Sequence, residues 1–220
     1  MYVIIAGGGL IGKGLTKRLA QQKHDVVVID FNAEVCEEIY ARYGAVAING
    51  NSTDLATLES AGIARCNVAV ATMNDDSDNL AFALLAKHFN VSQIIVKMND
   101  PKYENIYQTV GVKNISRGTE LLVDQIMLNI EAPELRTAIS MNNIEIAIFI
   151  IPEHAKCSGQ PVSTTVNQKG FPREVIFTCV ADEATGLFRI PRGDTILHEG
   201  DRVFLCGSMN DIKTAVKFLS

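Results

Sequence analysis

The sequence has no cluster of basic residues. Its 220 residues include 20 Lys and Arg against 25 Asp and Glu, which gives a formal net charge of −5 at pH 7. Binding to the phosphates of a nucleic acid needs clustered cations, so this balance argues against a nucleic-acid surface.

Long apolar runs are missing too. The longest, residues 144–151, contains Glu145, and it is far shorter than the about 20 residues that a membrane helix needs. The start, MYVIIAGGG, lacks the charged and apolar segments of a signal peptide. We therefore expect a soluble, cytoplasmic protein that does not insert into the membrane.

Metal-binding and disulfide patterns are absent as well. The five cysteines are scattered without a Cys-x-x-Cys pair, and the four histidines are dispersed. Zinc sites and redox motifs need close, regular spacings of these residues. We expect reduced, mostly buried thiols and no metal site.

The first 118 residues contain an alternation of apolar runs and helical patterns. The segments between the runs space their apolar residues for one buried helix face. Runs without polar alternation, separated by helices, indicate a parallel sheet of the doubly wound, Rossmann-like α/β class. We assign residues 1–118 to this domain. The runs span residues 2–6, 26–30, 45–48, 68–72, 93–98 and 112–116.

The pattern then changes. Residues 121–130, LLVDQIMLNI, are apolar on almost all sides, which indicates a helix buried on more than one face. Thr119 is a suitable N-cap and Pro133 ends the helix. Residues 119–135 are therefore assigned to a crossover helix and linker.

This apolar helix indicates an oligomer. In so small a protein, its burial needs a second subunit. We therefore expect a charged substitution at Ile126 or Leu128 to disrupt assembly.

Residues 136–220 predict a smaller α+β domain. The segment 144–151 places four isoleucines on one face of a strand. Further strands and a last helix are predicted at 174–180, 187–190, 202–206 and 210–219.

Residues 7–12, GGGLIG, match the pattern Gly-x-Gly-x-x-Gly between an apolar strand and a helix. Gly7 would allow the tight turn, Gly9 would let the backbone approach a pyrophosphate, and Gly12 would let helix and strand pack closely. Asp30 ends the second apolar run without a following Arg, which favours a free ribose diol over a 2′-phosphate. The alternative is a glycine turn that serves packing alone.

The chain lacks the groups that would make a bound nucleotide a reactant. No tyrosine is followed four residues later by a lysine, and the glycine loop has no Walker ending. Hydride transfer needs a proton donor or acceptor near the nicotinamide. We therefore expect a sensor with no catalytic residues, and the alternative is a small NAD-dependent oxidoreductase.

Two segments resemble a known family. Residues 50–80, GNSTDLATLESAGIARCNVAVATMNDDSDNL, and residues 191–207, PRGDTILHEGDRVFLCG, resemble the N-terminal (KTN) and C-terminal RCK modules of the TrkA/KtrA regulators of potassium transport. The two segments occur in the family's order, and the resemblance covers nearly the whole chain.

The resemblance implies a cytosolic gating subunit at the inner face of the cell membrane. It implies homodimers that assemble into a tetramer or an octameric ring beneath a potassium-translocating membrane subunit of the TrkH/KtrB type. It also implies binding of NAD(H) or of ATP/ADP, without enzymatic activity.

The family's nucleotide-binding positions carry over residue by residue. Lys97 ends the fifth apolar run, where it would reach a phosphate or remain an ordinary solvated lysine. The implied cofactor-binding residues are Gly7, Gly9, Leu10, Ile11, Gly12, Asp30, Asn32, Asn51, Ser52, Thr53, Thr72, Met73 and Lys97.

Two positions depart from the family pattern. Asn51 stands where an aspartate is usual, and Leu10 stands where ATP-responsive members often carry an arginine. Without that arginine a terminal phosphate loses a partner. The sequence therefore favours NAD(H), with ATP/ADP as the alternative.

Two features leave further ligands open. Asp75, Asp76 and Asp78 suit either an oxygen-liganded cation or, as we prefer, a solvated helix start. Some relatives bind a cyclic dinucleotide in the second domain, but residues 136–220 contain no nucleotide motif of their own.

Overall fold

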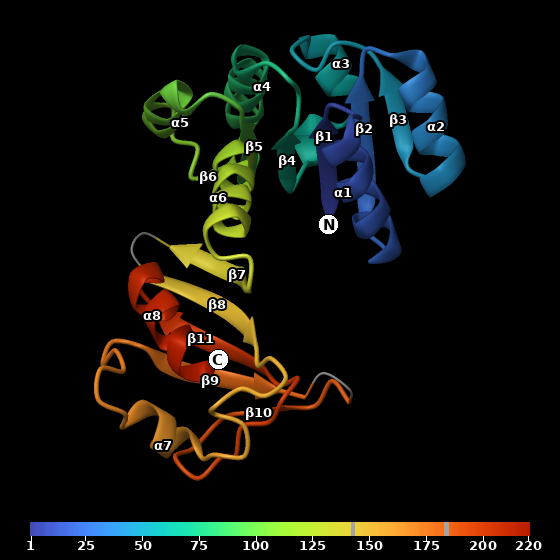
Figure 1. The fold of residues 1–220 in the computed structure, drawn as a ribbon. Helices are drawn as coiled ribbons and strands as arrows, with labels where there is room; N and C mark the ends of the chain where they lie inside the picture. Colours follow the sequence, from blue (N-terminus) through green and yellow to red (C-terminus); the bar gives the residue numbers. More distant parts are fainter. Residues whose placement is uncertain (142–143, 183–184) are drawn as a thin grey trace. The chain divides into compact units, whose positions relative to one another are not determined.

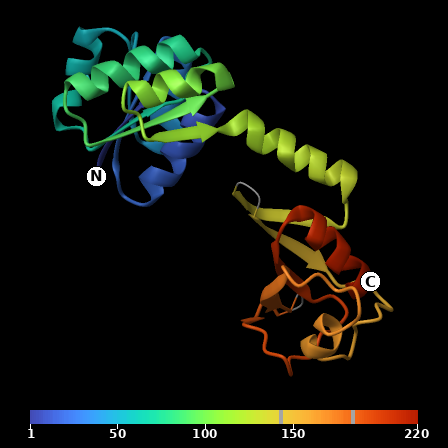
Figure 2. The ribbon, with the colours of Figure 1, turned by 90° about the vertical axis from the view of Figure 1, so that its left-hand side faces the viewer.

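The computed structural model describes residues 1–141, 144–182 and 185–220, and it forms two compact units, Met1–Leu121 and Leu122–Ser220. Figures 1 and 2 show the first as a sheet with helices and the second as a smaller α+β unit. The boundary lies inside helix α6 (Gly118–Glu131). The sequence analysis predicts a crossover helix and linker at residues 119–135, which include this boundary.

The first unit is built on a six-stranded parallel sheet in the order β3-β2-β1-β4-β5-β6. Each strand overlaps one of the six apolar runs, and the order reverses between β1 and β4, as in doubly wound sheets. The Rossmann-like fold is therefore confirmed. The strands are β1 (Tyr2–Ala6), β2 (Asp25–Asp30), β3 (Val46–Asn49), β4 (Val68–Ala71), β5 (Gln93–Met98) and β6 (Asn114–Arg117).

Helices cover both faces of this sheet (Figure 1). Successive strand residues point to opposite faces: Ile4 packs on the side of α3, α4 and α5, and Ile5 packs on the side of α1 and α2. Both faces of the strands therefore need apolar side chains, which explains the continuous runs. The helices are α1 (Leu10–Gln21), α2 (Ala33–Tyr43), α3 (Leu55–Ser60), α4 (Asp76–His88) and α5 (Glu104–Thr109), with short 3-10 turns at Ile63–Arg65 and Pro101–Tyr103.

The face that carries α1 has an open groove. Its volume is about 410 Å³, and side chains from α1, β1, β4 and β5 line it. Most are apolar, among them Leu15, Val70 and Ile95, and Lys97 lies beside them. We call this depression the α1-face groove.

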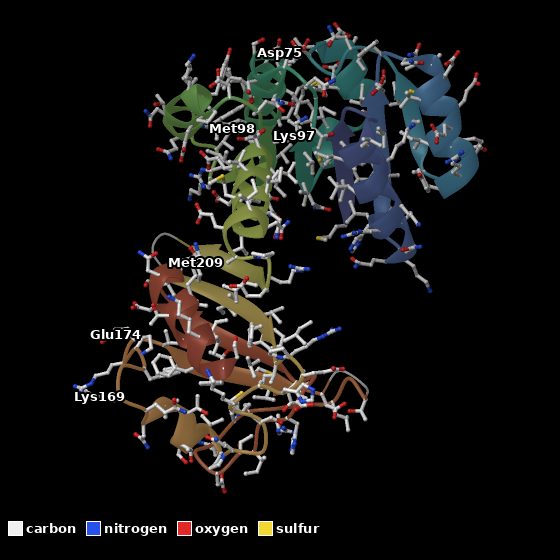
Figure 3. All side chains as sticks on the ribbon, in the orientation of Figure 1. Asp75, Lys97, Met98, Lys169, Glu174 and Met209 are labelled. Carbon is white, nitrogen blue, oxygen red and sulfur yellow. The ribbon has the colours of Figure 1, made fainter. Side chains whose placement is uncertain are left out.

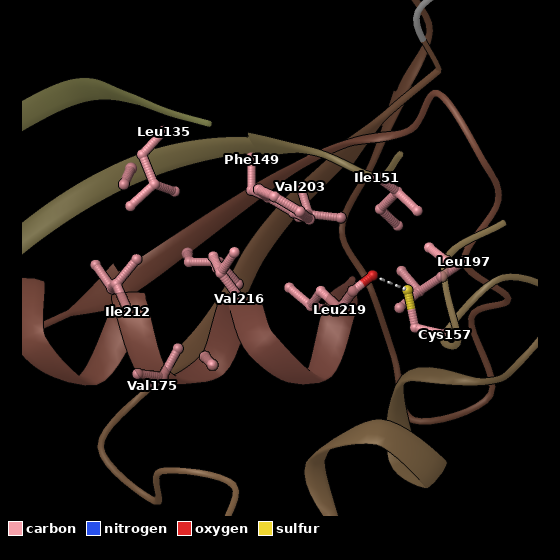
Figure 4. Close-up of a cluster of buried hydrophobic side chains, with 14 of the residues drawn as sticks. Leu135, Phe149, Ile151, Cys157, Val175, Leu197, Val203, Ile212, Val216 and Leu219 are labelled. Carbon is pink, nitrogen blue, oxygen red and sulfur yellow. Dashed lines mark hydrogen bonds between the residues drawn. The ribbon is translucent and has the colours of Figure 1, made fainter. Parts of the chain in front are cut away.

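The second unit holds a five-stranded antiparallel sheet in the order β10-β9-β11-β8-β7. Helix α8 (Met209–Leu219) packs against it, and Ser208 caps that helix. Figure 4 shows this core, in which the Cys157 thiol donates to the carbonyl oxygen of Leu219. The smaller α+β unit is therefore as predicted. Its other elements are β7 (Leu135–Met141), β8 (Ile144–Ile150), α7 (Val162–Val166), β9 (Ile176–Ala181), β10 (Phe188–Arg189) and β11 (Arg202–Gly207).

Helix α6 corrects two predictions. It begins at Gly118, directly after β6, so Thr119 lies inside the helix and is not its N-cap. Leu128 is only 5% exposed and belongs to the core of the second unit, whereas Ile126 is 56% exposed. A charge at Leu128 would therefore disrupt this core directly, and Ile126 is the position that tests assembly. The other exposed apolar side chains of α6 are Leu121, Leu122, Val123, Met127 and Ile130.

We expect Leu128→Ala to lower the free energy of unfolding by about 2–5 kcal/mol, because it removes a buried side chain and leaves a cavity. Leu84→Ala, on α4, removes an exposed side chain outside α6 and is the control. Urea denaturation of both variants measures the difference. A loss at Leu128 no larger than that at Leu84 would contradict the placement of Leu128 in the core.

Candidate functional site

The carboxyl ends of the parallel strands open into a crevice of about 670 Å³. It lies across the point where the strand order reverses between β1 and β4. Ligands of doubly wound sheets bind at this place, because the loops there diverge to either side. Eight of the residues predicted from the sequence line it: Gly7, Gly9, Asp30, Asn32, Asn51, Ser52, Thr72 and Met73.

The glycine loop has the geometry that its pattern predicts. Gly7 has φ +97°, a conformation that favours glycine. A Cβ atom at Gly12 would lie 2.0 Å from the carbonyl oxygen of Gly7, so only glycine lets α1 approach the loop this closely. A Cβ atom at Gly9 would meet no atom within 4 Å, so the backbone there is open to the crevice.

Asp30 ties the loop to the second strand. One carboxylate oxygen accepts a hydrogen bond from the backbone N–H of Gly8 at 2.7 Å, and the other accepts from the N–H of Asn32 at 2.8 Å. Asn32 in turn caps α2 by accepting from the N–H of Glu34. The half-buried carboxylate is thus held in place at the rim of the crevice, where its oxygens retain lone pairs that can accept further hydrogen bonds.

The end of β4 forms the floor of the crevice. The Thr72 hydroxyl lies 3.0 Å and 2.9 Å from the carbonyl oxygens of Ala6 and Gly7. The buried amide of Asn79 accepts from the N–H of Met73 and donates to its carbonyl oxygen. These bonds fix the chain where it leaves β4.

The loop after β3 brings Asn51 and Ser52 to the same crevice. The Asn51 side chain accepts hydrogen bonds from the N–H and the hydroxyl of Thr53. The Ser52 hydroxyl donates to the sulfur of Met73 at 3.1 Å, which joins this loop to the end of β4.

The structure does not bring the other predicted residues into the crevice lining. Leu10 is 94% exposed at the start of α1, and Gly12 is packed against the loop backbone. Ile11 and Lys97 line the α1-face groove, so Lys97 is assigned there and not to the crevice. Thr53 serves the turn after β3.

Several lining residues were missed from the sequence. They are Ile29, Phe31, Val35, Gly50 and Asn74. Asp75 and Asp78 also line the crevice, although the sequence analysis assigns them to a solvated helix start. Gly8 also matters, because a Cβ atom there would lie 2.6 Å from a Val35 methyl group. Only its place inside the glycine motif could have indicated this.

Asp75 and Asp76, at the start of α4, have different roles. Asp75 caps α4 (Figure 3), and hydrogen bonds from the side chain and backbone N–H of Ser77 hold its pKa below the ordinary value. Asp76 is buried and accepts from the N–H groups of Asn99 and Asp100 and from the hydroxyl of Tyr107. Among the described residues, no group of three His, Cys, Asp or Glu side chains is placed to hold a metal ion.

The crevice lining is acidic. It includes the carboxylates of Asp30, Asp75 and Asp78 and contains no Lys, Arg or His. Lys13 in the first turn of α1 forms an ion pair with Glu38 of α2. The lining also lacks Tyr and Cys, so it offers carboxylates as its titratable side chains and no paired acid and base for hydride transfer.

The chain matches two protein-family descriptions, the TrkA-N domain over residues 3–117 and the TrkA-C domain over residues 146–220. It is 28% identical over 228 residues to a "Trk system potassium uptake protein TrkA homolog" of Pyrococcus horikoshii, covering all of this chain and 97% of the relative. A homologue of the same name from Archaeoglobus fulgidus is 29% identical over 222 residues, covering 97% of this chain and 48% of the relative.

Solved structures share the fold. The GsuK RCK domain superposes with a TM-score of 0.67 at 20% identity, covering 99% of this chain and 47% of that one. A GsuK channel bound to NAD also gives a TM-score of 0.67, at 19% identity, with 100% and 39% coverage. None of the helices in the described ranges is long and apolar enough to span a bilayer.

We expect Gly12→Ala to destabilise the first unit by more than about 1 kcal/mol, because the added methyl group meets the Gly7 carbonyl oxygen 2.0 Å away. Gly14 is the matched control, since a Cβ atom there meets nothing within 4 Å in the same helix. Alanine at Gly14 should raise stability by about 0.5–1 kcal/mol. Denaturation curves of the two variants compare them, and equal effects would contradict the close approach of α1 to the loop.

Proposed function

Because this chain belongs to the TrkA-N domain family, we propose that it is a nucleotide-sensing regulatory subunit of a potassium uptake system. The observation that carries this proposal is the crevice, which combines a glycine loop and a fixed acid with no catalytic pair. The relatives named as TrkA potassium uptake proteins support the transport role. A site that binds a nucleotide without reacting with it suits a regulator.

The ligand is a nucleotide with a free ribose diol. Asp30 would accept from the ribose hydroxyls, and the uncapped N-terminus of α1 after Gly9 would hold the pyrophosphate. The walls of the crevice around the nucleotide would be formed by Asn32, Asn51, Ser52, Thr72 and Met73. Gly12 and Thr53 support the loops that carry these groups.

NAD(H) is our first choice, and ATP or ADP is the alternative. The acidic lining disfavours the concentrated negative charge of a triphosphate. The solved GsuK structures include one bound to NAD and one bound to ADP, so they are consistent with either ligand. The competing function, a small NAD-dependent oxidoreductase, would need sustained NADH turnover with a carbonyl substrate.

The proposed regulator is a homo-oligomer. Helix α6 exposes apolar side chains and carries Glu120, Asp124 and Glu131 without a single Lys or Arg. The α1-face groove is an apolar surface with Lys97 beside it. Apolar character and opposite charge favour the α6 of a second copy in this groove. Such dimers would build a tetramer or an octameric ring.

The ring would act on a membrane partner. We assign this partner to the potassium-translocating subunits of the TrkH/KtrB type, and the regulator would lie at the inner face of the membrane. Thr72 contributes to both the crevice and the α1-face groove. A nucleotide at Thr72 can therefore bias the assembly, provided that its affinity differs between two ring shapes.

The nucleotide site is tested by thermal unfolding. NADH at about 100 times its dissociation constant should stabilise the protein by about 2.7 kcal/mol, which is a rise in Tm of about 5–11 °C for a chain of this size. Asp30→Ala should abolish this rise. Asp25→Ala, at the exposed start of the same strand, is the control. No rise with NAD⁺, NADH, ATP or ADP would refute the proposal.

Assembly is tested by light scattering. Ile126→Asp places a charge on the exposed apolar face of α6 and should reduce the mass to that of the 24.0 kDa chain. Tyr40→Asp is the matched control, because Tyr40 is a comparably exposed side chain on α2. An unchanged mass for Ile126→Asp would contradict assembly through α6.

A further inference from the structure

The second half of α6 packs against the rest of the second unit through one face of the helix. Leu128 belongs to the core of that unit. Asp124 and Glu131 lie one helical turn before and after it, so they share its side of α6. The Glu131 carboxylate forms an ion pair with Lys213 of α8 at 2.7 Å. This face of α6 therefore turns two acidic side chains toward the rest of the unit.

Glu145 is a carboxylate on the core side of β8. It alternates along the strand with Ala147 and Phe149, which are both buried, and Figure 4 shows Phe149 in this core. The Oε2 atom of Glu145 is buried and accepts no hydrogen bond from any residue that the structure describes. An ionised oxygen in this place costs free energy, because it has lost its water and has no donor in exchange.

The charged groups on the two neighbouring helices do not remove this cost. Burial raises the pKa of the Glu145 carboxyl group, the nearby Asp124 carboxylate raises it further, and Lys213 lowers it by a smaller amount. Lys213 is already engaged with Glu131. The surroundings of Glu145 therefore favour its neutral form.

The other elements beside Glu145 direct their charges elsewhere. On β11, the residue opposite Glu145 is Gly207. Arg136, the charged residue of β7, donates to a backbone carbonyl near the start of that strand. On α8, the Asp211 carboxylate is bonded to the hydroxyl of the helix cap, and Lys217 is exposed.

We propose that Glu145 is a pH-sensitive contact between α6 and the rest of the second unit. When Glu145 is protonated, its neutral carboxyl group lets the second half of α6 pack firmly. When it is ionised, the buried charge and its repulsion from Asp124 loosen that half of the helix. The inference concerns the helix that joins the two units, and it does not depend on the nucleotide site.

The sign of the pH effect follows from the direction of the pKa shift. Because the pKa of Glu145 is raised in the folded protein, the folded chain takes up this proton at a higher pH than the unfolded chain does. Acidification from neutral pH therefore stabilises the packing of α6. The gain is complete below the ordinary pKa of a glutamate side chain.

The test is hydrogen exchange of the backbone amides of residues 122–131 in the full chain, measured by mass spectrometry and corrected for the intrinsic effect of pH. We expect the wild-type segment to be better protected at about pH 5 than at about pH 7.5. Glu145→Gln keeps the shape of the side chain without its charge. It should raise protection at neutral pH by about 5-fold or more, because it removes an unpaired buried charge, and it should lose most of the pH dependence.

Asp124→Asn should raise protection at neutral pH by about 2-fold, because it removes only the repulsion between like charges. Glu153→Gln is the matched control, since Glu153 is an exposed carboxylate just after β8. The control should leave protection and its pH dependence unchanged.

Equal or lower protection in Glu145→Gln at neutral pH, or a pH dependence that persists in this variant, would overturn the inference. If Glu145→Gln does not fold, Asp124→Asn decides the question, because Asp124 is exposed and its replacement leaves the core intact. Unchanged protection at neutral pH in Asp124→Asn would then overturn it.

Discussion

The hydrogen bonds of Asp30 are the interaction on which the crevice depends. Its two carboxylate oxygens join the N–H of Gly8, on the loop after β1, to the N–H of Asn32, on the turn after β2. Without these hydrogen bonds, the glycine loop after β1 would be free to shift relative to the turn after β2. One side chain thus holds the glycine loop and the turn after β2 in register, at the edge where two parallel strands end.

The sequence predicts the fold well because burial on both sides of a parallel sheet leaves a simple signal. Six apolar runs correspond to six strands, and the glycine spacing predicts the turn at Gly7 and the close packing at Gly12. The site was predicted in part. Lining residues such as Phe31 and Asn74 carry no motif and follow from the fold alone.

The misplaced residues share a physical cause. Lys97 lies on the same face of β5 as Ile95, which packs toward α1, so its side chain lines the groove there. Motif spacing gives a position along the strand but not the surface that the side chain reaches. The same limit applies to Leu128. When a helix is apolar on all sides, its sequence does not show which of its side chains are buried within the same chain.

Thr72 belongs to the lining of both the crevice and the α1-face groove. Thermodynamic linkage makes any coupling through it reciprocal: whatever a nucleotide does to the occupancy of the groove, the occupant of the groove does to nucleotide affinity by the same factor. Under the proposed assembly, nucleotide affinity would depend on the concentration of the protein. A cell could retune the response of such a regulator to its ligand by changing the amount of regulator it makes.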